Sequence, residues 1–116
     1  MANILVVEDD EAVSSLVARQ LERHGYDVRT AAGPLEALEA LRDWDVHLLL
    51  MDMGLPGMHG LDLVHLLRGA NLGIPAIAIT GEQLDQDVAQ AAGFLHLLIK
   101  PFGIDELLKA VRDVLP

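Results

Sequence analysis

Groups that can take part in phosphoryl transfer stand at four places in this sequence, each at the end of an apolar run. That chemistry needs a nucleophile, a metal, a hydroxyl group and a lysine, because it depends on positioning and charge neutralisation. The runs at 4–7, 47–51, 76–79 and 97–99 are followed by Glu8, Asp9 and Asp10, by Asp52, by Thr80, and by Lys100. A lone aspartate is more often a turn or cap residue, so the four places carry the argument only together.

The acidic residues require a counter-charge if the fold brings them together. Two unit charges about 4 Å apart interact by about 4 kcal/mol at an effective dielectric near 20. Lys100 supplies one positive charge, and a hard divalent cation that prefers oxygen ligands would supply two more. Two carboxylates, one backbone carbonyl and water molecules would complete an octahedral Mg²⁺ site.

Five apolar segments alternate with five amphipathic ones, which predicts a single α/β domain over residues 1–116 with a parallel sheet between helices. The strands are expected at 4–7, 28–30, 47–51, 76–79 and 97–99, and the helices around 13–21, 35–41, 63–67, 84–92 and 104–115. In the flavodoxin-like strand order 2-1-3-4-5, ligands bind between strands one and three. That order would place Asp9 beside Asp52, with Thr80 and Lys100 on the far side.

The composition and the length of the apolar runs bear on possible partners, on what can hold the fold together and on where the protein is located. The formal net charge of −10 over 116 residues disfavours direct binding to nucleic acid phosphates. The chain has no cysteine, so neither disulfides nor a thiolate metal site can hold the fold. No apolar run approaches the roughly 20 residues that cross a bilayer, and residues 1–3 do not resemble a signal peptide, so we expect a cytoplasmic protein.

Four sequence blocks in register resemble the receiver domains of response regulators in two-component phosphorelays. The blocks are ILVVEDD at 4–10, MDMGLPGMHG at 51–60, ITG at 79–81 and KPF at 100–102. The resemblance spans the whole chain and implies a three-layer flavodoxin-like fold. By its motif positions it implies Asp52 as phosphoacceptor, Asp9 as direct metal ligand, Glu8 as the acid that holds metal-bound water, Gly54 as the backbone carbonyl ligand of Mg²⁺, Thr80 as the hydroxyl that moves to the phosphoryl group, and Lys100 as its ion-pair partner.

The resemblance also implies a function and a set of partners. A sensor histidine kinase or histidine phosphotransferase would supply the phosphoryl group, and Mg²⁺ would be required. The phosphorylated domain would then change its surface toward a downstream protein target, as a monomer or weak dimer. Such a domain is a signalling phosphoacceptor rather than an enzyme, although it assists its own phosphorylation and dephosphorylation. The sequence holds no output domain, which favours a stand-alone regulator and leaves a piece of a longer protein as the alternative.

Three features depart from the family pattern. Leu97 stands where an aromatic switch residue is usual, His59 stands where Asp is frequent, and the stretch from Thr80 to Lys100 is short. We therefore expect activation to act mainly through the 81–92 segment, with Leu97 either filling the core or forming a static apolar patch. The Lys100–Pro101 peptide bond is expected to be cis, as in the family.

Other interpretations of these residues remain open. Asp10 and Glu11 are interpreted as acids at a helix N-terminus rather than metal ligands. A haloacid-dehalogenase-type phosphatase would need a second Asp at position 54, which is glycine. A flavodoxin-like cofactor carrier would need a phosphate-binding loop where residues 8–11 are all acidic. A docking module that works without phosphorylation is the third alternative.

Overall fold

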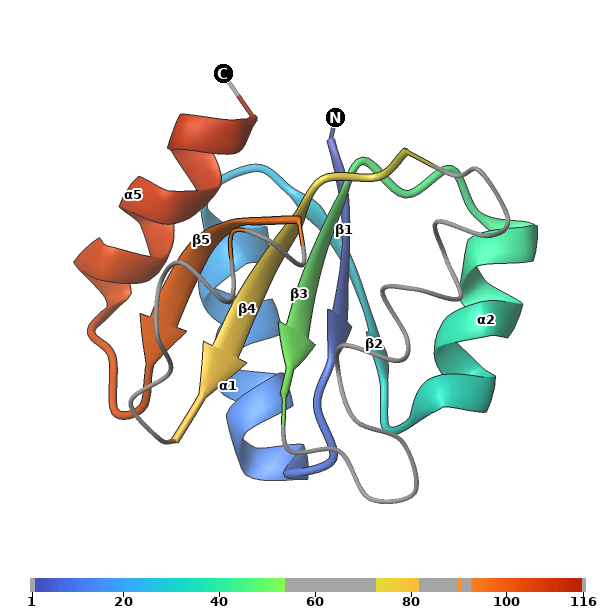
Figure 1. Cartoon of the computed structure of the whole chain (residues 1–116), viewed down its shortest axis with the longest axis horizontal. Coiled ribbons are helices and arrows are strands. Elements are labelled where there is room, and N and C mark those ends of the chain that lie inside the picture. The colour runs from blue at the N-terminus through green and yellow to red at the C-terminus, as the bar shows by residue number, and fades with distance from the viewer. Residues whose placement is uncertain (1, 54–72, 82–89, 91–92, 116) are drawn as a thin grey trace.

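The strands form one parallel sheet in the predicted order. In the computed structural model, which describes residues 2–53, 73–81, 90 and 93–115, the strands are β1 (Asn3–Val7), β2 (Asp27–Ala31), β3 (Leu48–Asp52), β4 (Ala76–Thr80) and β5 (Phe94–Ile99). All are parallel, in the order β2-β1-β3-β4-β5. Their carboxyl ends therefore meet at one edge of the sheet, where the arrowheads lie in Figure 1.

Alternating side chains divide the core into two layers, one on each face of the sheet. Leu5 and Val7 belong to one cluster of buried residues, which includes Ala37 of α2 (Pro34–Asp43). Ile4 and Val6 belong to the other, which includes residues of α1 (Glu11–Arg23) and α5 (Ile104–Val114). This alternation follows from the two-residue period of a strand. The result is a three-layer sandwich, with α1 and α5 on one face and α2 on the other (Figure 1).

Three of the five expected helices are described. The helices predicted around 63–67 and 84–92 fall on positions 54–72, 82–89 and 91–92, which lie outside the described residues. His59 and most of the segment expected to carry the activation signal lie there too. No described helix has the length and apolar character to cross a membrane.

Local sequence signals set the ends of the described helices. The Asp10 carboxylate accepts hydrogen bonds from the backbone N–H groups of Ala12 at 3.0 Å and Val13 at 3.3 Å, and so caps α1. Gly25 follows α1 with a φ of 91°, a backbone conformation that glycine adopts without strain. Pro34 opens α2, where its missing N–H costs nothing. The interpretation of Asp10 as a helix N-terminal acid is thus confirmed.

Each predicted strand differs from the structure by one residue or more at its ends. Asp52 and Thr80 are the last residues of β3 and β4 rather than the residues after them. β5 begins at Phe94, three residues earlier than the predicted start at position 97. Phe94 is buried and pairs with Ala76, and an irregular register between Ala76 and Ile77 accommodates the extra length. The prediction relied on the continuous apolar run at 97–99, and His96 interrupts the apolar residues before it.

Leu97 and Trp44 pack against the cluster on the α2 face. Leu97 is half-buried there, so it fills the core in part rather than standing free as a surface patch. Trp44 follows α2 and precedes β3, and the Arg29 guanidinium lies 4.6 Å from its ring centroid. This packing anchors the segment between α2 and β3. The Lys100–Pro101 peptide bond is cis, as predicted.

Candidate functional site

Backbone hydrogen bonds continue past the strand ends and fix the residues that follow. Glu8 N donates to Ala31 O at 3.0 Å, and Lys100 N donates to Thr80 O at 2.7 Å. Met53 N donates to Ile79 O at 2.8 Å, directly after Asp52. Each of these bonds ties one element to its neighbour in the sheet. The side chains of Glu8, Asp52 and Lys100 are therefore held at the same carboxyl edge by rigid backbone.

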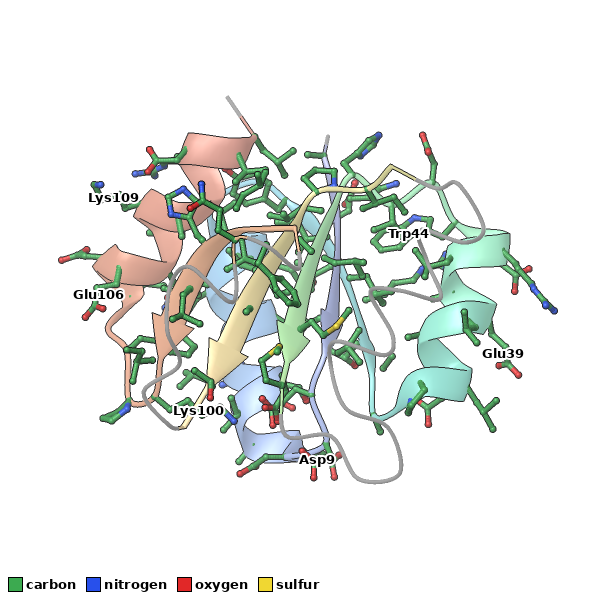
Figure 2. All side chains as sticks on the ribbon, viewed as in Figure 1. Asp9, Glu39, Trp44, Lys100, Glu106 and Lys109 are labelled. Atoms are coloured by element: carbon green, nitrogen blue, oxygen red, sulfur yellow. The ribbon has the colours of Figure 1, made fainter. Side chains whose placement is uncertain are left out.

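Three carboxylates gather at this edge. One oxygen from each of Glu8, Asp9 and Asp52 lies within 4.8 Å of the other two. Glu8 is only 2% exposed and Asp52 only 6%, whereas Asp9 is exposed to solvent. Asp9 and Lys100 are both seen at this end of the sheet in Figure 2. The predicted placement of Asp9 beside Asp52 is confirmed.

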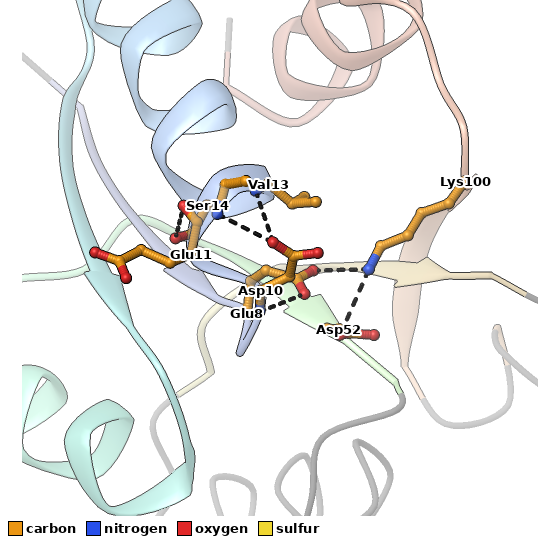
Figure 3. A network of polar contacts seen from close by, with 8 residues as sticks. Glu8, Asp10, Glu11, Val13, Ser14, Asp52 and Lys100 are labelled. Carbon is orange, nitrogen blue, oxygen red and sulfur yellow. Dashed lines mark hydrogen bonds and ion pairs between the residues drawn. The ribbon is translucent and has the colours of Figure 1, made fainter.

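A single ammonium group approaches two of these carboxylates. Lys100 Nζ lies 3.0 Å from Glu8 Oε2 and 3.6 Å from Asp52 Oδ2. Figure 3 draws both contacts as dashed lines. The Lys100 side chain is 28% exposed, so its charge is only partly screened by solvent. Counted over the described residues, three carboxylates and one ammonium leave two negative charges, which is the charge that one divalent cation neutralises.

The buried Glu8 carboxylate lies in an electrostatically unfavourable environment. Its Oε1 accepts a hydrogen bond from Asp10 N at 3.1 Å, while its buried Oε2 has no hydrogen bond among the described residues beyond the ion pair with Lys100. Burial raises the pKa of Glu8, and the neighbouring charge of Asp52 adds to this, against the opposing effects of Lys100 and the Asp10 N–H. A buried acid of this kind is stabilised by a nearby cation.

Lys100 shows the complementary response. Burial alone would lower the pKa of Lys100, but its close ion pair with Glu8 and the charge of Asp52 outweigh burial and raise the pKa. The ammonium therefore remains charged at neutral pH. A permanently charged lysine 3.6 Å from the Asp52 carboxylate can also pair with oxygens of a group attached to that carboxylate.

The donor set fits a magnesium ion. Its groups are hard oxygen ligands, and Asp9 is open to water, which matches the preference of Mg²⁺ for a few carboxylates and retained waters. Within the described part of the chain, the buried Glu8 Oε2 has no hydrogen bond besides its ion pair with Lys100, which gives the site a further reason to accept a cation. Gly54, the predicted carbonyl ligand, lies outside the described residues.

The remaining predicted residues divide into two groups. Thr80 is buried at 8% exposure on the last position of β4, next to the strand that ends in Asp52. Asp10 caps α1 and Glu11 lies exposed in its first turn, so both serve the helix. The sequence did not indicate that Lys100 lies closer to Glu8 than to Asp52, since that preference arises from side-chain packing.

Comparison with known proteins identifies the family. Residues 4–112 match the model of the response regulator receiver domain. The chain is 32% identical over 114 residues to the probable transcriptional regulatory protein TcrX of Mycobacterium tuberculosis, covering 97% of this chain and 49% of that protein. It is 34% identical over 111 residues to the DNA-binding response regulator MtrA of Mycobacterium leprae, covering 94% of this chain and 49% of that protein. The chain thus spans about half the length of these curated relatives.

Solved structures agree with the sequence matches. The chemotaxis response regulator CheY4 of Vibrio cholerae superposes with a TM-score of 0.91 at 30% identity, covering 99% of both chains. The response regulator TrrA of Thermotoga maritima, solved in complex with Mg²⁺ and BeF, superposes with a TM-score of 0.88 at 28% identity, covering 99% of this chain and all of that one. With the fold, the acidic edge and the sequence matches in agreement, the chain belongs to the family of response regulator receiver domains.

Proposed function

We propose that this chain is the phosphoacceptor of a two-component signalling system and that Asp52 takes the phosphoryl group. The observation that carries the proposal is the Asp52 carboxylate at the end of β3, with an ammonium 3.6 Å away and two further carboxylates beside it. The carboxyl ends of the strands thus combine a nucleophilic oxygen of Asp52, the positive charge of Lys100 and a cluster of carboxylates that a divalent cation would neutralise. Those are the parts that phosphoryl transfer uses.

The proposed reaction is an in-line displacement at phosphorus. An Asp52 oxygen forms the new P–O bond while the P–N bond to the donor's histidine ring breaks and its electron pair stays on the nitrogen. Asp52 and Asp9 would hold Mg²⁺ directly, with Glu8 acting through bound water and Gly54 through its carbonyl. When bound, the ion neutralises charge on the phosphoryl oxygens. Lys100 and the Thr80 hydroxyl would pair with the same oxygens.

The same residues support a signalling role rather than turnover of a substrate. A phosphatase that uses an aspartyl intermediate would need a second acid at position 54, and the sequence has glycine there. The domain would assist only its own phosphorylation and the hydrolysis of its own acyl phosphate. A phosphoryl group adds about 1.5 to 2 negative charges at Asp52, which is the input that alters the surface.

The partners follow from this role. The donor would be a sensor histidine kinase or a histidine phosphotransferase, and the recipient of the signal would be a downstream protein, with the domain itself a monomer or weak dimer in the cytoplasm. TcrX is named a transcriptional regulator and MtrA a DNA-binding regulator, and each is about twice the length matched here. The net charge of −10 argues against DNA binding by this chain itself.

Intact-mass measurement tests the proposal directly. The protein is incubated with acetyl phosphate and Mg²⁺, and a mass gain of one phosphoryl group is expected. Phosphotransfer profiling against a panel of phosphorylated histidine kinases would then identify the donor. Absence of any phosphoryl adduct with both acetyl phosphate and the kinases would leave a phosphorylation-independent docking module as the better description.

A further inference from the structure

The amino end of β1 is joined to the segment before β3 by two reciprocal hydrogen bonds, one of which uses a histidine ring nitrogen as its acceptor. Asn3 N donates to His47 Nδ1 at 2.8 Å, and His47 N donates to Asn3 O at 2.9 Å. The regular pairing of the two strands begins one residue later, with Ile4 opposite Leu48. The Asn3–His47 pair therefore closes the amino end of the contact between β1 and β3.

The donor in the first of these bonds determines where the His47 ring can carry a proton. A backbone N–H can only donate, so Nδ1 must offer its lone pair and the neutral ring must hold its proton on Nε2. Nε2 lies 3.3 Å from Asp45 Oδ2, a carboxylate oxygen that suits an N–H at this position. Uptake of a second proton would place an N–H on Nδ1, facing the N–H of Asn3. Two donors cannot share a hydrogen bond, so protonation and this bond exclude each other.

Charged groups on the neighbouring elements do not replace the lost bond. Asp45 attracts a protonated ring through Nε2 rather than Nδ1, and its side chain is 90% exposed, so water screens the attraction. Asp27 of β2 and Asp43 at the end of α2 are exposed, and within the described part of the chain neither forms an ion pair with His47. Arg29 of β2 lies over an aromatic ring, and the described residues just before β4 are uncharged.

We propose that His47 is an acid-sensitive latch, which holds the amino end of β1 to the segment before β3 while its ring is neutral and releases it when the ring takes up a proton. Only the open form accepts the proton at Nδ1, so opening is favoured as the pH falls through the ordinary range of histidine, about 6.5. The ring is 41% exposed, so protons reach it from solvent without unfolding of the domain.

The opening is confined to one side of β1. Asp27 N donates to Ala2 O at 3.0 Å, which keeps the start of β1 attached to β2. At their other ends β1 and β3 lead to Glu8 and Asp52, so the latch lies on the two strands that position the candidate site. It does not depend on phosphorylation of Asp52.

A second histidine provides a matched contrast within the same chain. His24 Nδ1 lies 2.9 Å from Gln20 O at the end of α1. A carbonyl oxygen can only accept, so this Nδ1 carries a proton whether the ring is neutral or charged. Protonation of His24 therefore keeps its contact, whereas protonation of His47 breaks one.

Amide hydrogen exchange followed by NMR between about pH 7.5 and about pH 5.5 tests the latch. Each rate is divided by the rate of an unstructured peptide at the same pH, which gives a protection factor. The protection of Asn3 N–H should fall severalfold toward the acidic end, by at most about tenfold per pH unit, because opening takes up one proton. Leu5 N–H in the middle of β1 and His24 N–H should keep their protection.

Substitutions separate the proton from the acceptor. His47→Asn offers an amide oxygen that can accept from Asn3 N–H and has no proton to gain, so the protection of Asn3 should become independent of pH. His47→Ala removes the acceptor and should give low protection at every pH. His24→Asn should leave the pH response of Asn3 as it is in the wild type.

The ring nitrogens give a readout that needs no variant. Their ¹⁵N signals at neutral pH should show Nδ1 without a proton in His47 and with a proton in His24. The opposite assignment for His47 would overturn the proposal, as would a protection factor of Asn3 that does not change with pH in the wild type. An equal fall at Leu5 would also overturn it, since that result means general unfolding in acid. A His47→Asn variant that keeps the full pH response would exclude His47 as its origin.

Discussion

Two polar clusters lie at opposite ends of β1 and β3, and they differ in how their charges are balanced. At the amino ends, Asn3 and His47 exchange hydrogen bonds: Asn3 N donates to His47 Nδ1 at 2.8 Å, and His47 N donates to Asn3 O at 2.9 Å. Asn3 Nδ2 donates to Asp45 O at 2.8 Å, and His47 Nε2 lies 3.3 Å from Asp45 Oδ2. These bonds join the start of β1 to the segment before β3, largely at the surface.

At the carboxyl ends the same two strands carry Glu8 and Asp52, both buried and both competing for Lys100. The Asp45 side chain at the amino end is 90% exposed, so water screens its charge. The acids at the carboxyl end have little such screening. The comparison shows that an excess of buried negative charge, rather than the presence of acidic and basic residues alone, distinguishes the candidate site at the carboxyl ends of the strands.

The largest effect is expected on phosphorylation, in which Asp52 of the carboxyl-end cluster should differ from Asp45 of the amino-end cluster. Asp52→Asn is nearly isosteric, so the fold should persist, but the amide cannot form the acyl phosphate and the phosphoryl mass gain should be lost entirely. Asp45→Asn makes the same change at the amino end and should label as the wild type does. Intact mass after acetyl phosphate and Mg²⁺ measures both. A full mass gain in the Asp52 variant would contradict the assignment.

Mg²⁺ should bind the cluster of Glu8, Asp9 and Asp52 at the carboxyl ends of the strands and so stabilise the folded chain. At a concentration about ten times its Kd, the ion should add about 1.4 kcal/mol to the free energy of unfolding, since it binds only the folded chain. That corresponds to about 5 °C in Tm for a domain of this size. Asp9→Ala should remove most of the shift, whereas Glu39→Ala, which removes an exposed acid from α2, should keep it. Thermal unfolding with and without Mg²⁺ measures these shifts in Tm. A full Tm shift in the Asp9→Ala variant would contradict the assignment of Asp9 to the metal site.

Asp10 should behave differently from its neighbour Asp9. Its carboxylate caps α1, so Asp10→Ala should lower the free energy of unfolding by about 1 kcal/mol. The Mg²⁺-dependent rise in Tm should remain, because the Asp10 carboxylate caps the helix through Oδ1. Asp10→Ser, which can still cap, should recover most of the stability. Chemical denaturation with and without Mg²⁺ measures these effects, and loss of the metal response would mean that Asp10 belongs to the site.

The smallest effect is a loss of stability expected from a substitution at the amino end of β1. Asn3→Ala removes the exposed hydrogen bond from Nδ2 to Asp45 O and should cost about 0.5 kcal/mol. Neither the phosphoryl mass gain nor the Mg²⁺ response should change, because the substitution lies at the other end of β1. Urea denaturation measures the cost. A clear loss of Mg²⁺ binding would show that the two ends of the strand are coupled.

Much of this arrangement could be predicted from residue order. The alternation of apolar runs with amphipathic segments determined the parallel sheet, and parallel strands necessarily bring the residues after Val7, Met51 and Ile79 to one edge. The cap at Asp10 was also predictable, because aspartate at the start of a helix accepts the free N–H groups that follow it. These features depend on periodicity and local hydrogen bonding, which a sequence displays.

The early start of β5 and the preference of Lys100 for Glu8 were decided by the tertiary structure. β5 gains its first residues by pairing Phe94 with Ala76 across an irregular register, a contact between distant parts of the chain. Lys100 could pair with either acid on the evidence of sequence alone. A separation of 3.0 Å rather than 3.6 Å depends on how the buried Glu8 side chain is packed and anchored. Coulomb attraction is stronger at the shorter separation and in surroundings that largely exclude water, so this choice exists only in the folded protein.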